Sequence, residues 1–189
     1  MCVWCTKCAV PRNLINAEMP LSETSKNPSA DLKAAQEGSA LLRRAGYLFR
    51  RLVQVNQALF AEEVAALNTD VTPVQFSLMT ALSEKGEMDQ NTLSAEVGLE
   101  RSSVAEVLPR LEDRGLIERR QSLDDRRVKL VRLSRKGKAM VKLLADAVQR
   151  SHDRIIEALP EAERDLFMLQ LIRLVEANNA KIKVPLNLG

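Results

Sequence analysis

The chain has 189 residues and a mass of 21.1 kDa, enough for one compact domain with appendages and too little for most multidomain enzymes. Its 46% hydrophobic and 28% charged residues, with seven Gly and seven Pro, exclude collagen-like, low-complexity and wholly disordered classes. No apolar run approaches the roughly 18 residues that a membrane span needs, and the N-terminus lacks the apolar core of a secretion signal. We therefore expect a cytoplasmic protein without a membrane partner.

The net charge of +3 is unevenly distributed along the chain. Residues 101–142 hold thirteen Lys and Arg against six Asp and Glu, whereas the other residues hold fifteen against nineteen. A basic block on a mildly acidic body favours a nucleic-acid partner over a merely solvated helix face.

The first segment, residues 1–31, is rich in Pro and Ser and is predicted to be a flexible tail. It contains all three cysteines, at a spacing compatible with a metal or iron–sulfur site: Cys2, Cys5 and Cys8. A fourth ligand is missing, because the only histidine, His152, lies far away in the sequence. We therefore predict no metal and no cofactor. Thiol-based redox sensing through these cysteines remains an alternative, and they would be absent from a protein that started at Met19.

A long amphipathic helix is predicted between Leu32 and Leu67 because apolar residues recur there at helical spacing. Its apolar stripe is wider than one small domain needs to bury, which suggests a partner chain. Further on, two more helices are predicted, from Arg135 to Ala158 and from Glu161 to Ala177. We assign residues 32–69 and 138–180 to a helical dimerisation region and residues 181–189 to a second flexible tail.

The segment between these helices, residues 70–137, reads as a DNA-binding domain. Thr72 and Pro73 begin a helix that stops near Gly86, and Asp89 or Asn91 caps a short helix that Gly98 ends. After a tight turn, another helix runs from Ser102 or Ser103 to Gly115. Two short helices joined by a Gly-containing turn are a helix-turn-helix candidate.

A basic β-hairpin is predicted immediately after these helices. Strands Leu116–Arg120 and Val128–Leu133 flank a polar turn with arginines at its tip, Ser122–Arg127. Helix-turn-helix plus basic hairpin describes a winged helix. The expected fold class is mainly α, with a small β-hairpin wing and long N- and C-terminal dimerisation helices.

Two motifs in this region resemble the MarR family of transcriptional regulators. Asp125-x-Arg127-x5-Leu133-Ser134-x-x-Gly137 is similar to the family's wing signature, which usually has Thr in place of Ser134. The preceding run Leu111–Ile117 is similar to the end of the family's recognition helix. The resemblance extends over roughly Leu41–Ala177. It implies a two-fold homodimer, with intertwined first and last helices, that presents two winged helices to double-stranded DNA.

Side chains opposite the apolar stripe of the second short helix are the first candidates for DNA contacts; they are Arg101, Ser102, Ser103, Glu106 and Arg110. The two serines could instead be N-caps. On the wing, Arg126 and Arg127 could enter the minor groove, and the resemblance assigns this role chiefly to Arg127, oriented by Asp125. Pro109 is unexpected within a helix, so we expect a helix that is kinked or begins late.

The resemblance also implies a small-molecule effector, held between the DNA-binding lobe and the dimer helices. Candidate aromatic walls and guanidinium groups are Arg43, Arg44, Tyr47 and Arg50 on the first helix, with Phe76 and Met79 on the second. The runs that begin at Thr72 and Asp89 look most like the branch that controls aromatic-compound catabolism. This points to an aromatic carboxylate or its coenzyme A thioester.

The sequence therefore predicts a homodimeric repressor that binds a palindromic operator and is released by such an effector. No phosphate loop, catalytic triad or paired carboxylate indicates an enzyme. A helical protein-interaction scaffold is the alternative from another class. The operator, the regulated genes, the effector and the choice between repression and activation stay open.

Overall fold

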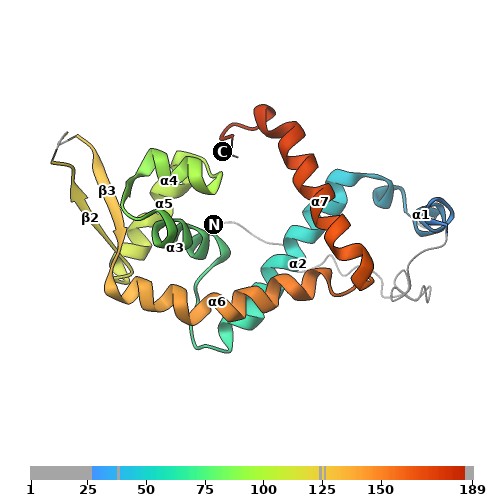
Figure 1. Ribbon diagram of the computed structural model, residues 1–189, viewed down its shortest axis with the longest axis horizontal. Coiled ribbons are helices and arrows are strands. Elements are labelled where there is room, and N and C mark those ends of the chain that lie inside the picture. Colours follow the sequence, from blue (N-terminus) through green and yellow to red (C-terminus); the bar gives the residue numbers. More distant parts are fainter. Residues whose placement is uncertain (1–26, 38, 124, 126, 186–189) are drawn as a thin grey trace, which may run out of the picture.

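The computed structural model describes residues 27–37, 39–123, 125 and 127–185. Figure 1 shows an elongated molecule, with a small lobe that carries the sheet at one end and long helices that extend away from it. Among the described residues, no helix is long and apolar enough to cross a membrane.

The lobe begins with α3 (Pro73–Lys85), which starts where the sequence predicted. The Thr72 hydroxyl accepts a hydrogen bond from the Gln75 backbone N–H at 3.3 Å, and the Gln75 side chain accepts one from the Thr72 N–H at 3.1 Å. This reciprocal capping box satisfies two N–H groups at the helix start that have no partner within the helix.

The next two helices are α4 (Gln90–Val97) and α5 (Arg101–Asp113). Asp89 caps α4 through hydrogen bonds from the N–H groups of Asn91 at 2.8 Å and Thr92 at 3.2 Å. Gly98 ends α4 in the left-handed region, with φ of 65°. The predicted helix-turn-helix is therefore confirmed.

The start of α5 differs from the prediction. Its N-cap is Glu100, so Ser102 and Ser103 lie in the first turn and are not N-caps. The late start suggested by Pro109 is also wrong, because the helix is assigned without interruption from Arg101 to Asp113. The proline removes one hydrogen-bond donor from the interior of the helix.

The predicted hairpin is present and gains a third strand. Strands β2 (Ile117–Gln121) and β3 (Lys129–Leu133) pair antiparallel, with Arg119 opposite Val131. A two-residue strand, β1 (Met88–Asp89), pairs with the other side of β3. The sheet order is β1-β3-β2, so the wing is attached to the residues that lead into α4.

One apolar core joins the lobe to the long helices. Leu78, Leu93, Leu108 and Leu111 are at most 1% exposed, and the core continues into α2 and α6 through Phe60, Val64 and Leu144. Burial of such side chains is the main stabilising term of folding. The lobe therefore shares one hydrophobic core with the part of α2 around Phe60 and Val64 and the part of α6 around Leu144.

The long N-terminal helix predicted between Leu32 and Leu67 is broken into three pieces. They are α1 (Pro28–Glu37), a 3₁₀ turn (Ala40–Arg43) and α2 (Ala45–Ala65). Ser39 caps the 3₁₀ turn by accepting from the Leu41 N–H, and the backbone of Arg44 is extended, so regular α-helix is interrupted before α2. Residues 28–31, expected to belong to the tail, form the start of α1.

At the other end, α6 (Arg135–Ile156) ends two residues before Ala158, and α7 (Glu161–Asn178) follows after Pro160. A short 3₁₀ turn (Asn179–Lys181) leads to the last described residues. There, Lys183 lies 2.9 Å from the carboxylate of Glu100 at the start of α5. The last described residues therefore return to the lobe (Figure 1).

Candidate nucleic-acid interface and adjoining pocket

One face of α5 is fully exposed and polar. Val104, Leu108 and Leu111 are buried on the opposite face, as predicted. The five predicted contact residues of this helix are all exposed: Arg101, Ser102, Ser103, Glu106 and Arg110. Within the described part of the chain, Arg101 and Arg110 form no ion pair, so both guanidinium groups are available to an anion.

Other arginines of the basic block are engaged in ion pairs that stiffen the wing. Arg119 on β2 donates to the carboxylate of Glu112 on α5, and this hydrogen bond lowers the pKa of Glu112 against the opposing effect of burial. Arg120 donates to Glu87 at 2.8 Å. These arginines link the wing to α5 and to the segment before β1.

Two residues at the wing tip, Asp125 and Arg127, form an ion pair. The Asp125 carboxylate accepts from the Arg127 backbone N–H at 2.9 Å and from its guanidinium at 3.0 and 3.1 Å. The side-chain hydrogen bond from Arg127 holds the pKa of Asp125 below its ordinary value. Arg127 is still 91% exposed, so the pair presents a fixed cation to the solvent. Arg126, the other predicted wing contact, lies outside the described residues.

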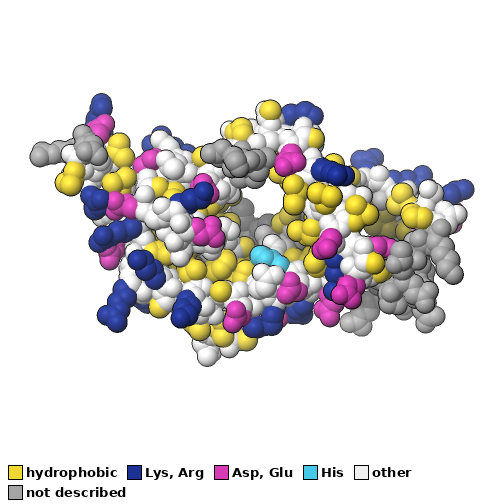
Figure 2. Space-filling model, in the orientation of Figure 1, with side chains coloured by type: hydrophobic (Ala, Val, Ile, Leu, Met, Phe, Trp, Pro, Cys, Tyr) yellow, Lys and Arg dark blue, Asp and Glu magenta, His cyan; other side chains and the backbone are white. Residues whose placement is uncertain are grey.

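Figure 2 shows Lys and Arg side chains gathered around the end of the molecule that carries the wing. Acidic side chains lie between them, in agreement with the ion pairs described above. The exposed face of α5 and the tip of the wing lie on the same lobe (Figure 1).

The wing motif seen in the sequence has a structural reason. Ser134 caps α6 by accepting from the Gly137 N–H at 3.0 Å, and its hydroxyl donates to the Gly115 carbonyl at 2.7 Å. Gly137 must lack a side chain because a Cβ there would overlap the Leu116 carbonyl oxygen. These residues fix the start of α6 against the end of α5.

Arg114, which ends α5, connects it to two other parts of the chain. Its guanidinium lies 2.7 Å from the carboxylate of Asp70, in the link between α2 and α3, and donates to the Gln75 side chain at 3.3 Å. Lys136 on α6 donates to the Arg114 carbonyl at 2.8 Å. Sequence reasoning missed this connection because its partners are far apart in the chain.

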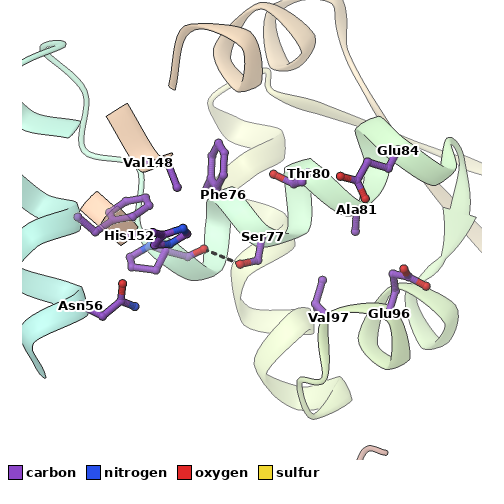
Figure 3. A pocket seen from close by; sticks show the side chains of 12 residues that line it. Asn56, Phe76, Ser77, Thr80, Ala81, Glu84, Glu96, Val97, Val148 and His152 are labelled. Carbon is purple, nitrogen blue, oxygen red and sulfur yellow. Dashed lines mark hydrogen bonds between the residues drawn. The ribbon is translucent and has the colours of Figure 1, made fainter. Parts of the chain in front are cut away.

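A pocket of about 380 Å³ lies between the lobe and the long helices. Its walls come from α2, α3, α4 and α6, and the rings of Phe60 and Phe76 meet there with centroids 6.2 Å apart. In Figure 3, Asn56 and His152 lie at one end, Glu84 and Glu96 at the other, and Ser77 and Thr80 between them. Its volume falls within the range of small-molecule sites, and two aromatic rings contribute to its lining.

The predicted effector residues do not come together in this pocket. Phe76 lines it, but Met79 is fully buried in the core. Arg43 and Arg44 lie before α2. Near the start of α2, the guanidinium carbon of Arg50 lies 5.5 Å from the centroid of the Tyr47 ring. The polar side chains of the lining come from other residues, and no local motif in the sequence indicates them: Asn56, Ser77, Thr80, Glu84, Glu96 and His152.

A second, more apolar groove of about 540 Å³ runs between α2, α6 and α7, and it shares Asn56 and His152 with the first pocket. Large hydrophobic side chains continue beyond it on α2 and α7, and Figure 2 shows hydrophobic atoms around the hollow beside α7. Every residue of α7 keeps some exposure in the single chain. Cys2, Cys5 and Cys8 lie outside the described residues, so their predicted alternatives stay untested.

Comparison with known proteins gives consistent results. The model of the MarR family matches residues 71–129. The transcriptional regulator HosA of Escherichia coli O111:H- is 31% identical over 137 residues, covering 71% of this chain and 96% of HosA. The PcaV transcriptional regulator of Streptomyces coelicolor, solved with its natural ligand, has a TM-score of 0.67 and 30% identity, covering 74% of this chain and 96% of PcaV. BpsR of Bordetella bronchiseptica, whose DNA binding is regulated by 6-hydroxynicotinic acid, has a TM-score of 0.64 and 25% identity, covering 69% of this chain and 92% of BpsR.

Proposed function

Since this chain belongs to the MarR family of transcriptional regulators, we propose that it acts in the cytoplasm as a homodimeric repressor whose operator binding is released by a small aromatic effector. DNA binding and regulation by ligands follow from the family, and the relatives are regulators rather than enzymes. The dimer, the DNA contacts and the effector are our proposals. The exposed, unpaired cations Arg101 and Arg110 on the polar face of α5 carry the DNA-binding part.

In this proposal α5 enters the major groove, and the two unpaired arginines contact phosphates or guanine edges. Ser102 and Ser103 lie near the N-terminus of the helix, where hydroxyl and backbone N–H groups suit a phosphate. Glu106 faces the same side and can accept from a cytosine amino group. Arg127 on the wing then reaches the neighbouring minor groove.

The dimer is supported by the apolar faces of α2 and α7. An 18-residue helix without a fully buried residue gains little stability from its own chain, because most helical stability in proteins comes from packing an apolar face. The exposed apolar residues of α7 are numerous: Leu166, Met168, Leu169, Ile172, Leu174 and Val175. Two-fold pairing of these faces would present two lobes to a palindromic operator.

The pocket between the lobe and the long helices is the proposed effector site. A ligand there would touch α2 and α6 on one side and α3 and α4 on the other, and so could change the position of the lobe relative to the dimer helices. An aromatic carboxylate or its coenzyme A thioester is the sequence-based candidate. The aromatic acid that regulates BpsR gives this class some support.

The first test is a titration of the purified protein on the intergenic DNA beside its own gene, at two salt concentrations and with competitor DNA. We expect specific binding that weakens steeply with salt, because phosphate contacts release counterions. Wild type should sediment as a dimer, and Ile172→Glu on α7 should give monomers that bind the operator poorly. A wild-type monomer without salt-dependent DNA affinity would contradict the proposal and favour a helical scaffold.

A further inference from the structure

The carboxylates that line the effector pocket both lie at one of its ends. Glu84 on α3 and Glu96 on α4 form one end, and the described lining includes neither Lys nor Arg. Glu96 lies 3.6 Å from Lys85, whereas Glu84 forms no ion pair within the described chain. An anion at this end would meet at least one uncompensated carboxylate at short range.

Two polar atoms at this pocket are buried without a hydrogen-bond partner in the described structure. They are the side-chain oxygens of Asn56 and Thr80, on α2 and α3 respectively, and both residues line the pocket. Buried polar atoms in folded proteins nearly always have a partner, so each such atom requires an explanation. In contrast, the neighbouring Ser77 hydroxyl already donates to the Pro73 carbonyl at 3.0 Å.

At the end formed by Glu84 and Glu96 the hydrogen-bonding groups are acceptors, and the neighbouring Thr80 hydroxyl can donate or accept. The N–H donors of the lining, the Asn56 amide and the His152 ring, lie at the opposite end. The ligand group that complements the Glu84 and Glu96 end therefore donates hydrogen bonds through O–H or N–H. The Phe60 and Phe76 rings supply an aromatic wall against which a planar ring can pack.

We infer that the effector is an aromatic molecule with hydroxyl or amino donors that presents an uncharged or cationic group, and not a carboxylate, to Glu84 and Glu96. This inference rests on the proposed function, since it takes the pocket to be the effector site. An aromatic acid bound here would turn a ring donor toward that end and would lack the ion pair that an ammonium group can form with Glu84.

Three probes of nearly equal size test the ligand class. Tyramine carries a phenol and an ammonium group, 3-(4-hydroxyphenyl)propionate replaces the ammonium by a carboxylate, and 4-methoxyphenethylamine replaces the phenol by a methyl ether. Thermal unfolding of the protein gives a dissociation constant for each probe through the shift of the midpoint with concentration. We expect tyramine to bind about tenfold more tightly than either analogue, because each analogue loses one matched interaction.

Variants then place the interaction in this pocket. Glu84→Gln keeps the shape and removes the charge, so it should remove the preference for ammonium over carboxylate. Glu37→Gln, an exposed position on α1, should leave the preference unchanged. Thr80→Val replaces the unpartnered hydroxyl by a methyl group of similar size, so it should raise the unfolding midpoint of the free protein and weaken tyramine binding. A purely structural role of Thr80 would not give these opposite effects.

The outcomes separate this inference from the proposed function. Failure of tyramine to shift the midpoint, tighter binding of the propionate, or an unchanged preference in Glu84→Gln would each overturn the inference. Salt-dependent operator binding in the same preparation would leave the regulator proposal intact. Conversely, tyramine binding with the expected preference in a protein without operator affinity would support the pocket chemistry and contradict the proposed function.

Discussion

Replacing Arg127 by Ala tests the role of the wing directly. The side chain is 91% exposed and its hydrogen bonds go to Asp125, so its removal leaves no cavity in the core. We therefore expect the unfolding midpoint to stay nearly unchanged. Any loss of operator affinity then reports a lost DNA contact and not a damaged fold.

The expected loss follows from two wings in the proposed dimer. One well-placed arginine in a groove contributes roughly tenfold in affinity, so two wings amount to about a hundredfold. Each neutralised phosphate contributes about 0.9 to the slope of log affinity against log salt, so the slope should fall by about 1.8. The affinity of Arg127→Ala should fall by a similar factor for different operator sequences if the guanidinium recognises the shape and charge of the groove and not individual bases.

The assay is fluorescence anisotropy of a labelled operator, titrated at several salt concentrations between about 50 and 200 mM. Arg51→Ala provides the matched control, because it removes an exposed arginine of α2, far along the chain from the lobe, whose side chain donates to Gln54 within the same helix. Asp125→Asn should show a part of the Arg127→Ala effect, because it weakens the ion pair that orients the guanidinium. Unchanged affinity and slope in Arg127→Ala would remove the wing from the DNA-binding surface.

Three further predictions concern stability. Gly137→Ala should destabilise the protein by about 1–3 kcal/mol in urea unfolding, since its Cβ would overlap the Leu116 carbonyl and force α6 away; wild-type stability would contradict the close approach. Glu112 has its pKa lowered below 4.5 by the hydrogen bond from Arg119, so its stabilising effect is fully present above that pH and is lost as the pH falls through the lowered value. Glu112→Gln should therefore show a flatter decline of stability between about pH 5 and 3, and an identical pH profile would count against the ion pair. Pro109→Ala should raise stability by about 1–3 kcal/mol, because it restores a hydrogen-bond donor inside α5, whereas a loss would indicate that the packing needs the proline.

Features of the fold that depend on local chemistry were predictable from the sequence. Thr72 before Pro73, Asp89 before a short apolar pattern and Gly98 after it determine helix ends through side chains only a few residues away. The hairpin was visible for the same reason, since alternation and a polar turn are local signals. Glu100 was missed as an N-cap because its side chain makes no capping hydrogen bond.

Features that depend on distant contacts were not predictable. The strand β1 has only two residues and exists through its pairing with β3, more than forty positions later. The pocket gathers side chains from four helices, so its polar residues, such as Asn56 and His152, carry no common spacing in the sequence. The exposed face of α5 was predictable because the buried stripe opposite it has helical periodicity.

Asp89 connects the wing to the helix-turn-helix. Its backbone pairs with Leu130 in β3, and its carboxylate begins α4. Wing and helix-turn-helix therefore share one anchoring residue and have to rotate together. In a dimer of such lobes, an effector would leave the structure of each winged helix unchanged. It would alter the distance between the two lobes along the duplex and their rotation about the duplex axis. Operators with one inserted or deleted base pair at their centre should then differ in how readily the effector releases them.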